Sequence, residues 1–173
     1  MINTKQKYDE LKKLPIYRNN GFECDMGWFE ILYDLGQKIT GYCDQNQLPL
    51  PKIQQIKEKL GFLRFYFMFQ TQIDTRHNEL LRSWVREAEN QSKTTCEQCG
   101  ETGQLYNTGG RLHVACQNHR EENSLTEDEF KKRLESMKIQ QKCESCDKIG
   151  LNKVTSSDGK IHYFCISHYN LNN

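Results

Sequence analysis

Three features are missing from this 173-residue sequence. It has no run of 18 apolar residues, which excludes a membrane-spanning helix of ordinary length and any membrane partner. Its first residues, MINTKQKYDELKK, contain no apolar stretch of the kind found in a secretory signal, so we expect a cytoplasmic protein. It also lacks an excess of one charge, with 24 Lys+Arg against 23 Asp+Glu. Because non-specific nucleic-acid binding depends on clustered cations, this balance disfavours a nucleic-acid partner.

Cysteine, by contrast, is plentiful. Apolar residues make up 36% of the chain and charged residues 27%, so the sequence is globular but polar, and any single core is modest. The sequence contains eight cysteines. In a secreted protein they would be expected to form disulfides. With no secretory signal expected, and with CxxC spacing, metal ligation is the better interpretation.

Six of the eight cysteines lie in two copies of one pattern, CxxC followed by CxxH. The first copy runs from Cys96 to His119 and the second from Cys143 to His168, so the two first cysteines are 47 residues apart. The similarity also covers residues between these motifs, and it indicates an internal duplication. The further aligned pairs are Gly103 with Gly150, Gly110 with Gly159, Arg111 with Lys160, Leu112 with Ile161, and His113 with His162.

The spacing of the motifs predicts two metal sites. Two residues between ligands let a tight turn aim both side chains at one ion, and two such turns joined by a β-hairpin complete a tetrahedral Cys3His shell. Thiolate and imidazole donors favour zinc, and four protein ligands leave no position for substrate, so we expect two structural Zn²⁺ ions in tandem zinc ribbons. The predicted ligands are Cys96, Cys99, Cys116 and His119 in the first ribbon, and Cys143, Cys146, Cys165 and His168 in the second.

Turn residues between the ligand pairs support the predicted ribbons. Gly109-Gly110 and Asp158-Gly159 lie between apolar stretches, and both dipeptides are favoured in two-residue hairpin turns. His113 and His162 each lie three residues before a ligand cysteine, an odd offset that places them on the opposite face of a strand. We therefore expect two surface histidines. The alternative is that one of them replaces the predicted histidine ligand of its ribbon or contacts a partner.

A short helix is predicted between the ribbons, over residues 127–138. Thr126 and Glu129 have capping-box spacing, and Phe130, Leu134 and Met137 recur at helical spacing. The apolar stripe is narrow. The favoured interpretation is that this helix docks on one ribbon, and the alternative is that it presents the stripe to a partner.

Residues 1–92 predict a small α+β domain. Its helices are expected over residues 4–14, from a cap at Asp25 through Cys43, and from a cap at Asp74 or Thr75 towards Ser92. The last of these helices leads almost directly into Cys96, so the first ribbon should pack close to it. The domains predicted for the whole chain are residues 1–92, the first ribbon at 93–120, the linker helix at 121–139 and the second ribbon at 140–173.

A β-hairpin is expected between the second and third helices. Residues 62–69 alternate with both faces largely apolar, which predicts a strand that is central or covered by helices. The segment before Gly61 also suits a helix beginning at Pro51, but we favour a strand that pairs through a turn near Gly61. Polar residues of this hairpin suggest a small binding surface, although a solvated strand edge is the simpler interpretation. They are Lys57, Lys59, Arg64 and Tyr66.

Two of these segments carry a family resemblance. GFECDMGWFEILYDL and IKEKLGFLRFYF, followed by a helix that ends at a CxxC, resemble a family of small phage and prophage proteins without an assigned activity. The family pattern looks like Cys-Gly-Asp-Gly-Trp, then Val-Lys-Glu-Lys-Phe-Gly-x-Leu-Arg-Phe-Tyr, then one ribbon. The resemblance covers residues 21–119, but Asp25-Met26 stands where Gly-Asp is usual and the second ribbon is additional. It implies a phage or mobile-element origin and a host-directed interaction in the host cytoplasm. The residues that carry it are Cys24, Gly27, Trp28, Lys57, Glu58, Lys59, Gly61, Leu63, Arg64, Phe65 and Tyr66.

Closed metal sites, balanced charge and duplicated ribbons favour a non-enzymatic protein that binds and modulates a host protein complex, such as a defence or transcription machine. One alternative is a nucleic-acid-binding ribbon protein. Another is an enzyme with a site in residues 1–92, for instance one built on Cys24 and its acidic neighbours. A His-metal nuclease is excluded because only 16 and 18 residues separate the ligand pairs. The candidate partner-binding residues are Lys57, Lys59, Arg64, Tyr66, Arg111 and Lys160.

Overall fold

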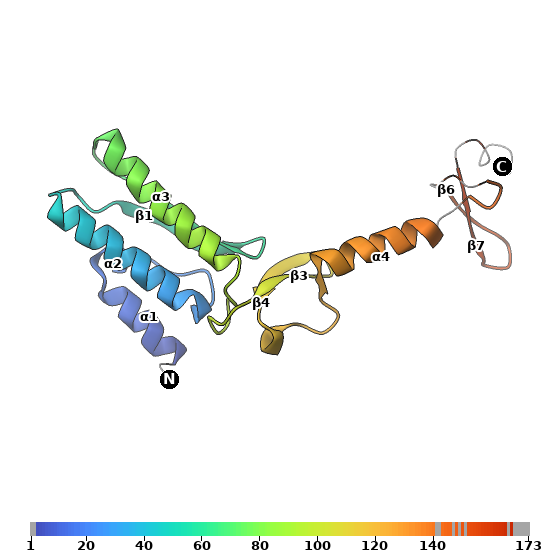
Figure 1. Cartoon of the computed structure of the whole chain (residues 1–173), viewed down its shortest axis with the longest axis horizontal. Coiled ribbons are helices and arrows are strands. Elements are labelled where there is room, and N and C mark those ends of the chain that lie inside the picture. Colours follow the sequence, from blue (N-terminus) through green and yellow to red (C-terminus); the bar gives the residue numbers. More distant parts are fainter. Residues whose placement is uncertain are drawn as a thin grey trace. The chain divides into compact units, whose positions relative to one another are not determined.

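The structure, a computed structural model, describes residues 3–140, 143–146, 148, 150, 152–165 and 167. Helices are combined with small antiparallel sheets, so the fold is α+β as predicted. The chain divides into two compact units, Met1–Thr126 and Glu127–Asn173 (Figure 1). None of the helices in the described part of the chain has the length and apolar character needed to cross a membrane.

Three long helices build the first unit, close to where the sequence predicts them. α1 spans Thr4–Lys13, α2 spans Phe29–Gln45 and α3 spans Thr75–Ser92. A 3-10 turn, η1 at Pro15–Tyr17, ends α1 because proline cannot continue a helix. The predicted cap of α3 is confirmed, since the Asp74 side chain accepts the Arg76 backbone N–H at 2.8 Å.

The predicted cap of α2 is wrong. A 3-10 turn, η2 at Met26–Trp28, precedes α2, and the Asp25 side chain makes no capping hydrogen bond. Instead, the Asp25 backbone N–H donates to Glu97 Oε1 at 3.1 Å. The approach of a segment 72 residues away therefore decides the conformation of this helix start.

The predicted hairpin is confirmed, with β1 at Lys52–Lys59 paired antiparallel to β2 at Phe62–Met68. Leu60 and Gly61 connect them with φ angles of 57° and 85°. The expectation that both faces are covered is wrong, because Tyr66 is 41% exposed on the outer face. α3 packs on α2 and on β2, and both helices lie in front of the hairpin in Figure 1. The hairpin's inner face is buried there: Ile53, Ile56, Leu63, Phe65 and Phe67.

Both edges of this hairpin are hydrogen-bonded to other parts of the first unit. On the β2 side, the Leu63 N–H donates to Ser92 Oγ at 3.0 Å and the Phe65 N–H donates to Glu89 Oε1 at 3.1 Å. On the β1 side, Glu23 exchanges backbone hydrogen bonds of 2.9 Å with Ile56 and Glu58. These contacts satisfy strand-edge groups that would otherwise be open to pairing with another chain.

A second hairpin follows α3. β3 at Gln104–Thr108 pairs with β4 at Arg111–Ala115 through the predicted two-residue turn, Gly109-Gly110, whose φ angles are 60° and 99°. Sequence reasoning missed a third strand. β5 at Leu125–Thr126 pairs with β3, so the strand order is β4-β3-β5.

The second unit contains a helix and one hairpin. α4 spans Glu127–Gln140, with every side chain of residues 127–136 exposed. β6 at Asn152–Thr155 pairs antiparallel with β7 at Ile161–Phe164. The two-residue turn predicted between them is wrong, because residues 156–160 form a five-residue connection. A hydrogen bond of 2.9 Å from the Ser156 N–H to the Lys160 carbonyl closes this loop.

Candidate metal centres

The four predicted ligands of the first copy converge in the structure. The donor atoms of Cys96, Cys99, Cys116 and His119 all lie within 4.8 Å of one another, so this cluster could hold a metal ion. Cys99 Sγ is 3.6 Å from Cys116 Sγ, and His119 Nδ1 is 3.6 Å from Cys96 Sγ and 3.3 Å from Cys116 Sγ. The cysteines are free thiols, and a disulfide would require about 2.05 Å between sulfurs.

Backbone N–H groups stabilise the thiolate form of a cysteine in this cluster. Burial raises the pKa of the Cys116 thiol, but hydrogen bonds from Cys99 and from the backbone N–H groups of Asn118 and His119 outweigh it. The pKa of Cys116 therefore lies below its ordinary value. Its neighbour behaves oppositely, because burial and the hydrogen bonds to Cys96 and Cys116 raise the pKa of Cys99 to about 11. Without an ion, Cys116 is thus the thiolate of this pair and Cys99 keeps its proton, which metal binding would have to displace.

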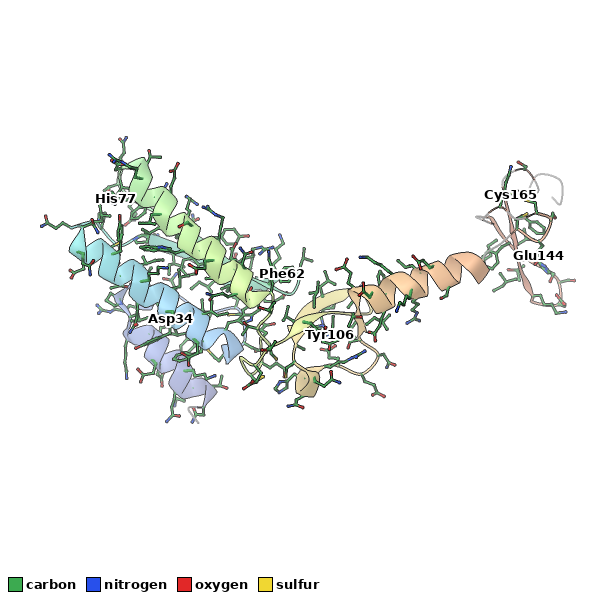
Figure 2. The ribbon with its side chains drawn as sticks, viewed as in Figure 1. Asp34, Phe62, His77, Tyr106, Glu144 and Cys165 are labelled. Atoms are coloured by element: carbon green, nitrogen blue, oxygen red, sulfur yellow. The ribbon has the colours of Figure 1, made fainter. Side chains whose placement is uncertain are left out.

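The second copy gathers three of its predicted ligands. The sulfurs of Cys143, Cys146 and Cys165 lie within 4.8 Å of one another, and Cys146 Sγ is 3.8 Å from Cys165 Sγ. Figure 2 labels Cys165 beside the β6–β7 hairpin. The fourth predicted ligand, His168, lies outside the described residues. The three sulfurs alone form a second cluster that could hold a metal ion.

The same backbone hydrogen bonds shape the two clusters. In each copy the first cysteine of the CxxC donates its N–H to the carbonyl five residues later, at 2.8 Å. The next residue, Glu97 or Glu144, donates its N–H to a carbonyl on the second strand of its hairpin, at 3.2 Å and 3.1 Å. The duplication seen in the sequence is therefore a duplication of local structure.

Close packing requires a glycine at the same position of both copies, Gly103 in the first and Gly150 in the second. A Cβ at Gly103 would lie 3.0 Å from the Ala115 carbonyl and from the Cys96 nitrogen. A Cβ at Gly150 would lie 2.8 Å from Tyr163. In each copy, glycine lets the chain after the CxxC turn pass close to the second strand of the hairpin.

The first cluster is attached directly to the rest of its unit. The Gly27 N–H donates to the Glu97 carbonyl at 2.7 Å, and Trp28 Nε1 donates to the Thr95 carbonyl at 2.9 Å. A Cβ at Gly27 would lie 2.3 Å from the carbonyl oxygens of Cys96 and Glu97. The first copy was expected to pack close to α3, but the contacts that hold its CxxC turn come from the η2 turn.

The chain was compared with protein families, curated proteins and solved structures. No protein-family model, curated protein or solved structure matches the chain. The resemblance to phage proteins therefore stays a prediction, and the geometry of the chain itself carries the functional argument.

The two aligned histidines occupy different environments. The surface position predicted for His113 is wrong, because this residue is only 7% exposed and neither ring nitrogen has a hydrogen-bond partner. Burial, and then the nearby Arg111, lower its pKa. His162 is partly exposed, and its Nδ1 lies 2.8 Å from Glu144 Oε1. Among the described residues, neither histidine belongs to a cluster that could hold a metal ion.

The candidate partner-binding residues fall into two groups. Lys57 lies opposite Arg64 in the β1–β2 register, and Tyr66 and Lys59 share their outer face. Arg111 instead pairs with the Glu121 carboxylate, and Lys160 pairs with Asp158 at 3.1 Å. The second group is therefore locally neutralised. The hairpin group is not paired with a carboxylate within the part of the chain that the structure describes.

Cys24, the possible nucleophile in residues 1–92, has a raised pKa. Burial, and then the carboxylates of Glu97 and Asp25, raise the pKa of Cys24 to about 12. At neutral pH it remains a thiol, which is a poor nucleophile. Cys43 is buried in α2, and burial raises its pKa as well.

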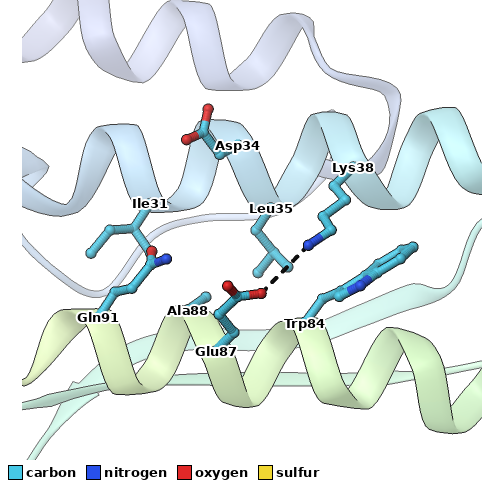
Figure 3. A pocket seen from close by; sticks show the side chains of 8 residues that line it. All are labelled: Ile31, Asp34, Leu35, Lys38, Trp84, Glu87, Ala88 and Gln91. Atoms are coloured by element: carbon cyan, nitrogen blue, oxygen red, sulfur yellow. Dashed lines mark hydrogen bonds and ion pairs between the residues drawn. The ribbon is translucent and has the colours of Figure 1, made fainter.

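A cavity of about 230 Å³ lies between α2 and α3 (Figure 3). Lys38 spans it, with Nζ 3.4 Å from Glu87 Oε2 and 4.9 Å from the Trp84 ring centroid. An ion pair and a half-covered indole occupy its polar side, Asp34 is a second carboxylate in its lining, and no cysteine, serine or histidine lines it. The lining residues are Ile31, Asp34, Leu35, Lys38, Trp84, Glu87, Ala88 and Gln91.

Proposed function

We propose that both clusters bind Zn²⁺ as structural sites, so that the chain carries two tandem Cys3His zinc ribbons. The supporting observation is the spacing of the donor atoms. Bond lengths of about 2.3 Å for Zn–S and about 2.05 Å for Zn–N give a tetrahedron with S···S edges of about 3.8 Å and S···N edges of about 3.6 Å. The sulfurs lie 3.6 Å and 3.8 Å apart in the two clusters, and the sulfur–nitrogen separations are 3.6 Å and 3.3 Å. His168 is the proposed fourth ligand of the second ion.

In this proposal zinc supplies folding free energy and no chemistry. Four protein donors fill a tetrahedral shell, so substrate or water has no coordination position. Structural zinc in a ribbon of this size contributes about 10–16 kcal/mol on binding, which replaces the missing apolar core. The first cluster is held against the η2 turn, so the loaded ribbon also stabilises the N-terminal part of its unit.

The biological role that we propose is binding of a host protein complex by a non-enzymatic protein of phage or mobile-element origin, acting in the host cytoplasm. Closed metal sites, the charge balance and the high pKa of Cys24 support a binding role over catalysis. The motif resemblance supports the origin, and with it a defence or transcription machine as the class of target. Nucleic-acid binding is the second candidate, because unpaired cations gather on the β1–β2 hairpin.

Metal analysis tests the zinc sites. The purified chain is expected to carry two zinc ions by elemental analysis, and Cys96→Ser and Cys143→Ser are each expected to lose one ion and unfold their own ribbon in proton NMR spectra. Cys24→Ser, which lies outside both clusters, should keep two ions. Fewer than two zinc ions per chain, or an intact ribbon after ligand substitution, would remove the proposal.

A capture experiment tests the binding role. The zinc-loaded chain is expected to retain the same host protein complex in repeated affinity captures, and the Cys96→Ser variant is expected to lose it. Micromolar or tighter binding of a nucleic acid without protein capture would favour the second candidate instead.

A further inference from the structure

The outer face of the β1–β2 hairpin concentrates positive charge in a chain that is nearly neutral. Directly opposed residues of a two-stranded sheet share a face, and the register pairs Lys52 with Met68, Lys57 with Arg64 and Lys59 with Phe62. The acid of these strands, Glu58, faces the other way, with its carboxylate accepting the Gly61 N–H. We call this surface the basic face. Its residues are Lys52, Lys57, Lys59, Phe62, Arg64 and Tyr66.

Three cations of the basic face, Lys57, Lys59 and Arg64, lie on neighbouring positions of the regular part of the ladder, and Lys52 lies beyond the irregularity between Ile53 and Gln55. Side chains two residues apart on one strand are separated by about 6.6–6.8 Å, and opposed side chains on the two strands by about 4.5–5.5 Å. A further cation approaches at the turn end, where Lys93 Nζ lies 5.8 Å from the Phe62 ring centroid (Phe62 is labelled in Figure 2). The two strands therefore present four positive charges and Lys93 adds a fifth at their turn end, and the described residues pair none of the five with a carboxylate.

Two acids border this face without neutralising it. The Glu23 carboxylate accepts the Gln55 amide at 2.8 Å beside β1, and the Glu89 carboxylate accepts the Phe65 N–H beside β2. These same segments occupy the strand edges, so a partner is not expected to bind there by adding a β-strand. Recognition must use the side chains of the face itself.

We propose that the basic face binds an acidic segment of the protein partner, a short run of Asp and Glu residues. This inference rests on the proposed binding role and adds the chemistry of the partner. Alternate carboxylates of an extended peptide repeat at the spacing of Lys57 and Lys59, so that several charge pairs form together.

Single-stranded nucleic acid fits the face less well. Such ligands gain much of their affinity from bases stacked on exposed aromatic rings. Here Lys57 Nζ lies 5.9 Å above the Tyr66 ring centroid and Lys93 covers Phe62, so a cation already occupies the ring face that a base would use.

The test uses the zinc-loaded full chain labelled with ¹⁵N, titrated at low salt with a blocked octaglutamate peptide and, separately, with an oligothymidylate of equal charge. The peptide is expected to bind saturably, to shift the amide signals of β1 and β2, and to lose at least tenfold in affinity in the variant Lys57→Glu/Arg64→Glu. Because that variant also removes a cation from Tyr66, Lys59→Glu serves as a milder second variant, with an expected loss of several-fold. The matched control is Lys132→Glu/Arg133→Glu on α4, which changes the net charge equally and should leave peptide affinity unchanged.

Absence of saturable peptide binding, equal affinity in the hairpin variants and the α4 control, or tighter binding of the oligothymidylate would each overturn the inference. A different outcome concerns the proposed function. If the Lys57→Glu/Arg64→Glu variant keeps two zinc ions and still captures the host complex as well as the parent, the basic face is not the binding surface, although the protein-binding role stands.

Discussion

Replacement of Gly27 by alanine should lower the free energy of unfolding of the first unit. The added methyl would lie 2.3 Å from two backbone carbonyl oxygens, those of Cys96 and Glu97. Backbone atoms cannot swing aside as a flexible side chain can. The η2 turn must therefore separate from the first CxxC turn, and the 2.7 Å hydrogen bond from Gly27 to Glu97 is lost.

The expected magnitude combines two effects. Overpacking of a closely packed contact costs about 1–3 kcal/mol, and loss of the hydrogen bond costs about 0.5–1.5 kcal/mol. A total of about 3 kcal/mol is a large part of the 5–15 kcal/mol by which ordinary domains are stable. With a urea dependence of about 1.5 kcal/mol per molar, the unfolding midpoint should fall by about 2 M.

Urea unfolding followed by tryptophan fluorescence is the measurement, since both tryptophans, Trp28 and Trp84, lie in the first unit. Gly41→Ala is the control, because no atom lies within 4 Å of its added methyl and alanine favours helix α2 by about 0.5–1 kcal/mol. Both variants should keep two zinc ions. An unchanged midpoint in Gly27→Ala would refute the claim that close packing of the η2 turn against Cys96 and Glu97 stabilises the first unit.

Other contacts lead to further expectations. Ser92→Ala should lower the free energy of unfolding in urea by about 1–3 kcal/mol, because it leaves the buried N–H of Leu63 in β2 without an acceptor. Ser83→Ala, on the exposed side of the same helix, should change this free energy by less than about 0.5 kcal/mol. Equal effects of the two substitutions would contradict this expectation. Gly150→Ala would place a methyl group 2.8 Å from Tyr163. This variant should release one zinc ion to a competing chelator faster than the parent does and release the other at the parent's rate. Equally fast release of both ions would contradict the steric reason given for Gly150. His113 has a lowered pKa in the folded chain, so its protonation in the unfolded chain removes stability as pH falls below about 6.5. At pH 6 this loss is at most about 0.8 kcal/mol, so His113→Leu should gain more thermal stability over the parent at pH 6 than at pH 8, and a pH-independent difference would disprove the assignment.

Much of the secondary structure could be predicted because its causes are local. The Gly109-Gly110 turn needs only two residues that accept positive φ, and α3 needs only an apolar stripe and the Asp74 cap. The convergence of Cys96 with Cys99 depends on one turn and could likewise be predicted.

The failures have a common cause in long-range contacts. Asp25 has the residue type of a helix cap, but the carboxylate of Glu97 holds its backbone N–H instead. His113 was expected at the surface, but only 7% of it is exposed. The Gly61 turn, 52 residues earlier, lies against the backbone of His113 and the side chain of Leu105. Leu125 and Thr126 have the pattern of a helix start, yet they also complete a sheet with β3.

By itself, the sequence determined the sulfur donors of both clusters and the imidazole donor of the first, since ligands two residues apart on a tight turn meet whatever the rest of the chain does. Only the tertiary structure decided which surfaces remain free. The packing of helices on one side of the β1–β2 hairpin buries its apolar face and turns its lysines and arginine outward together. A nearly neutral chain thereby acquires a positively charged surface that no count of its residues reveals.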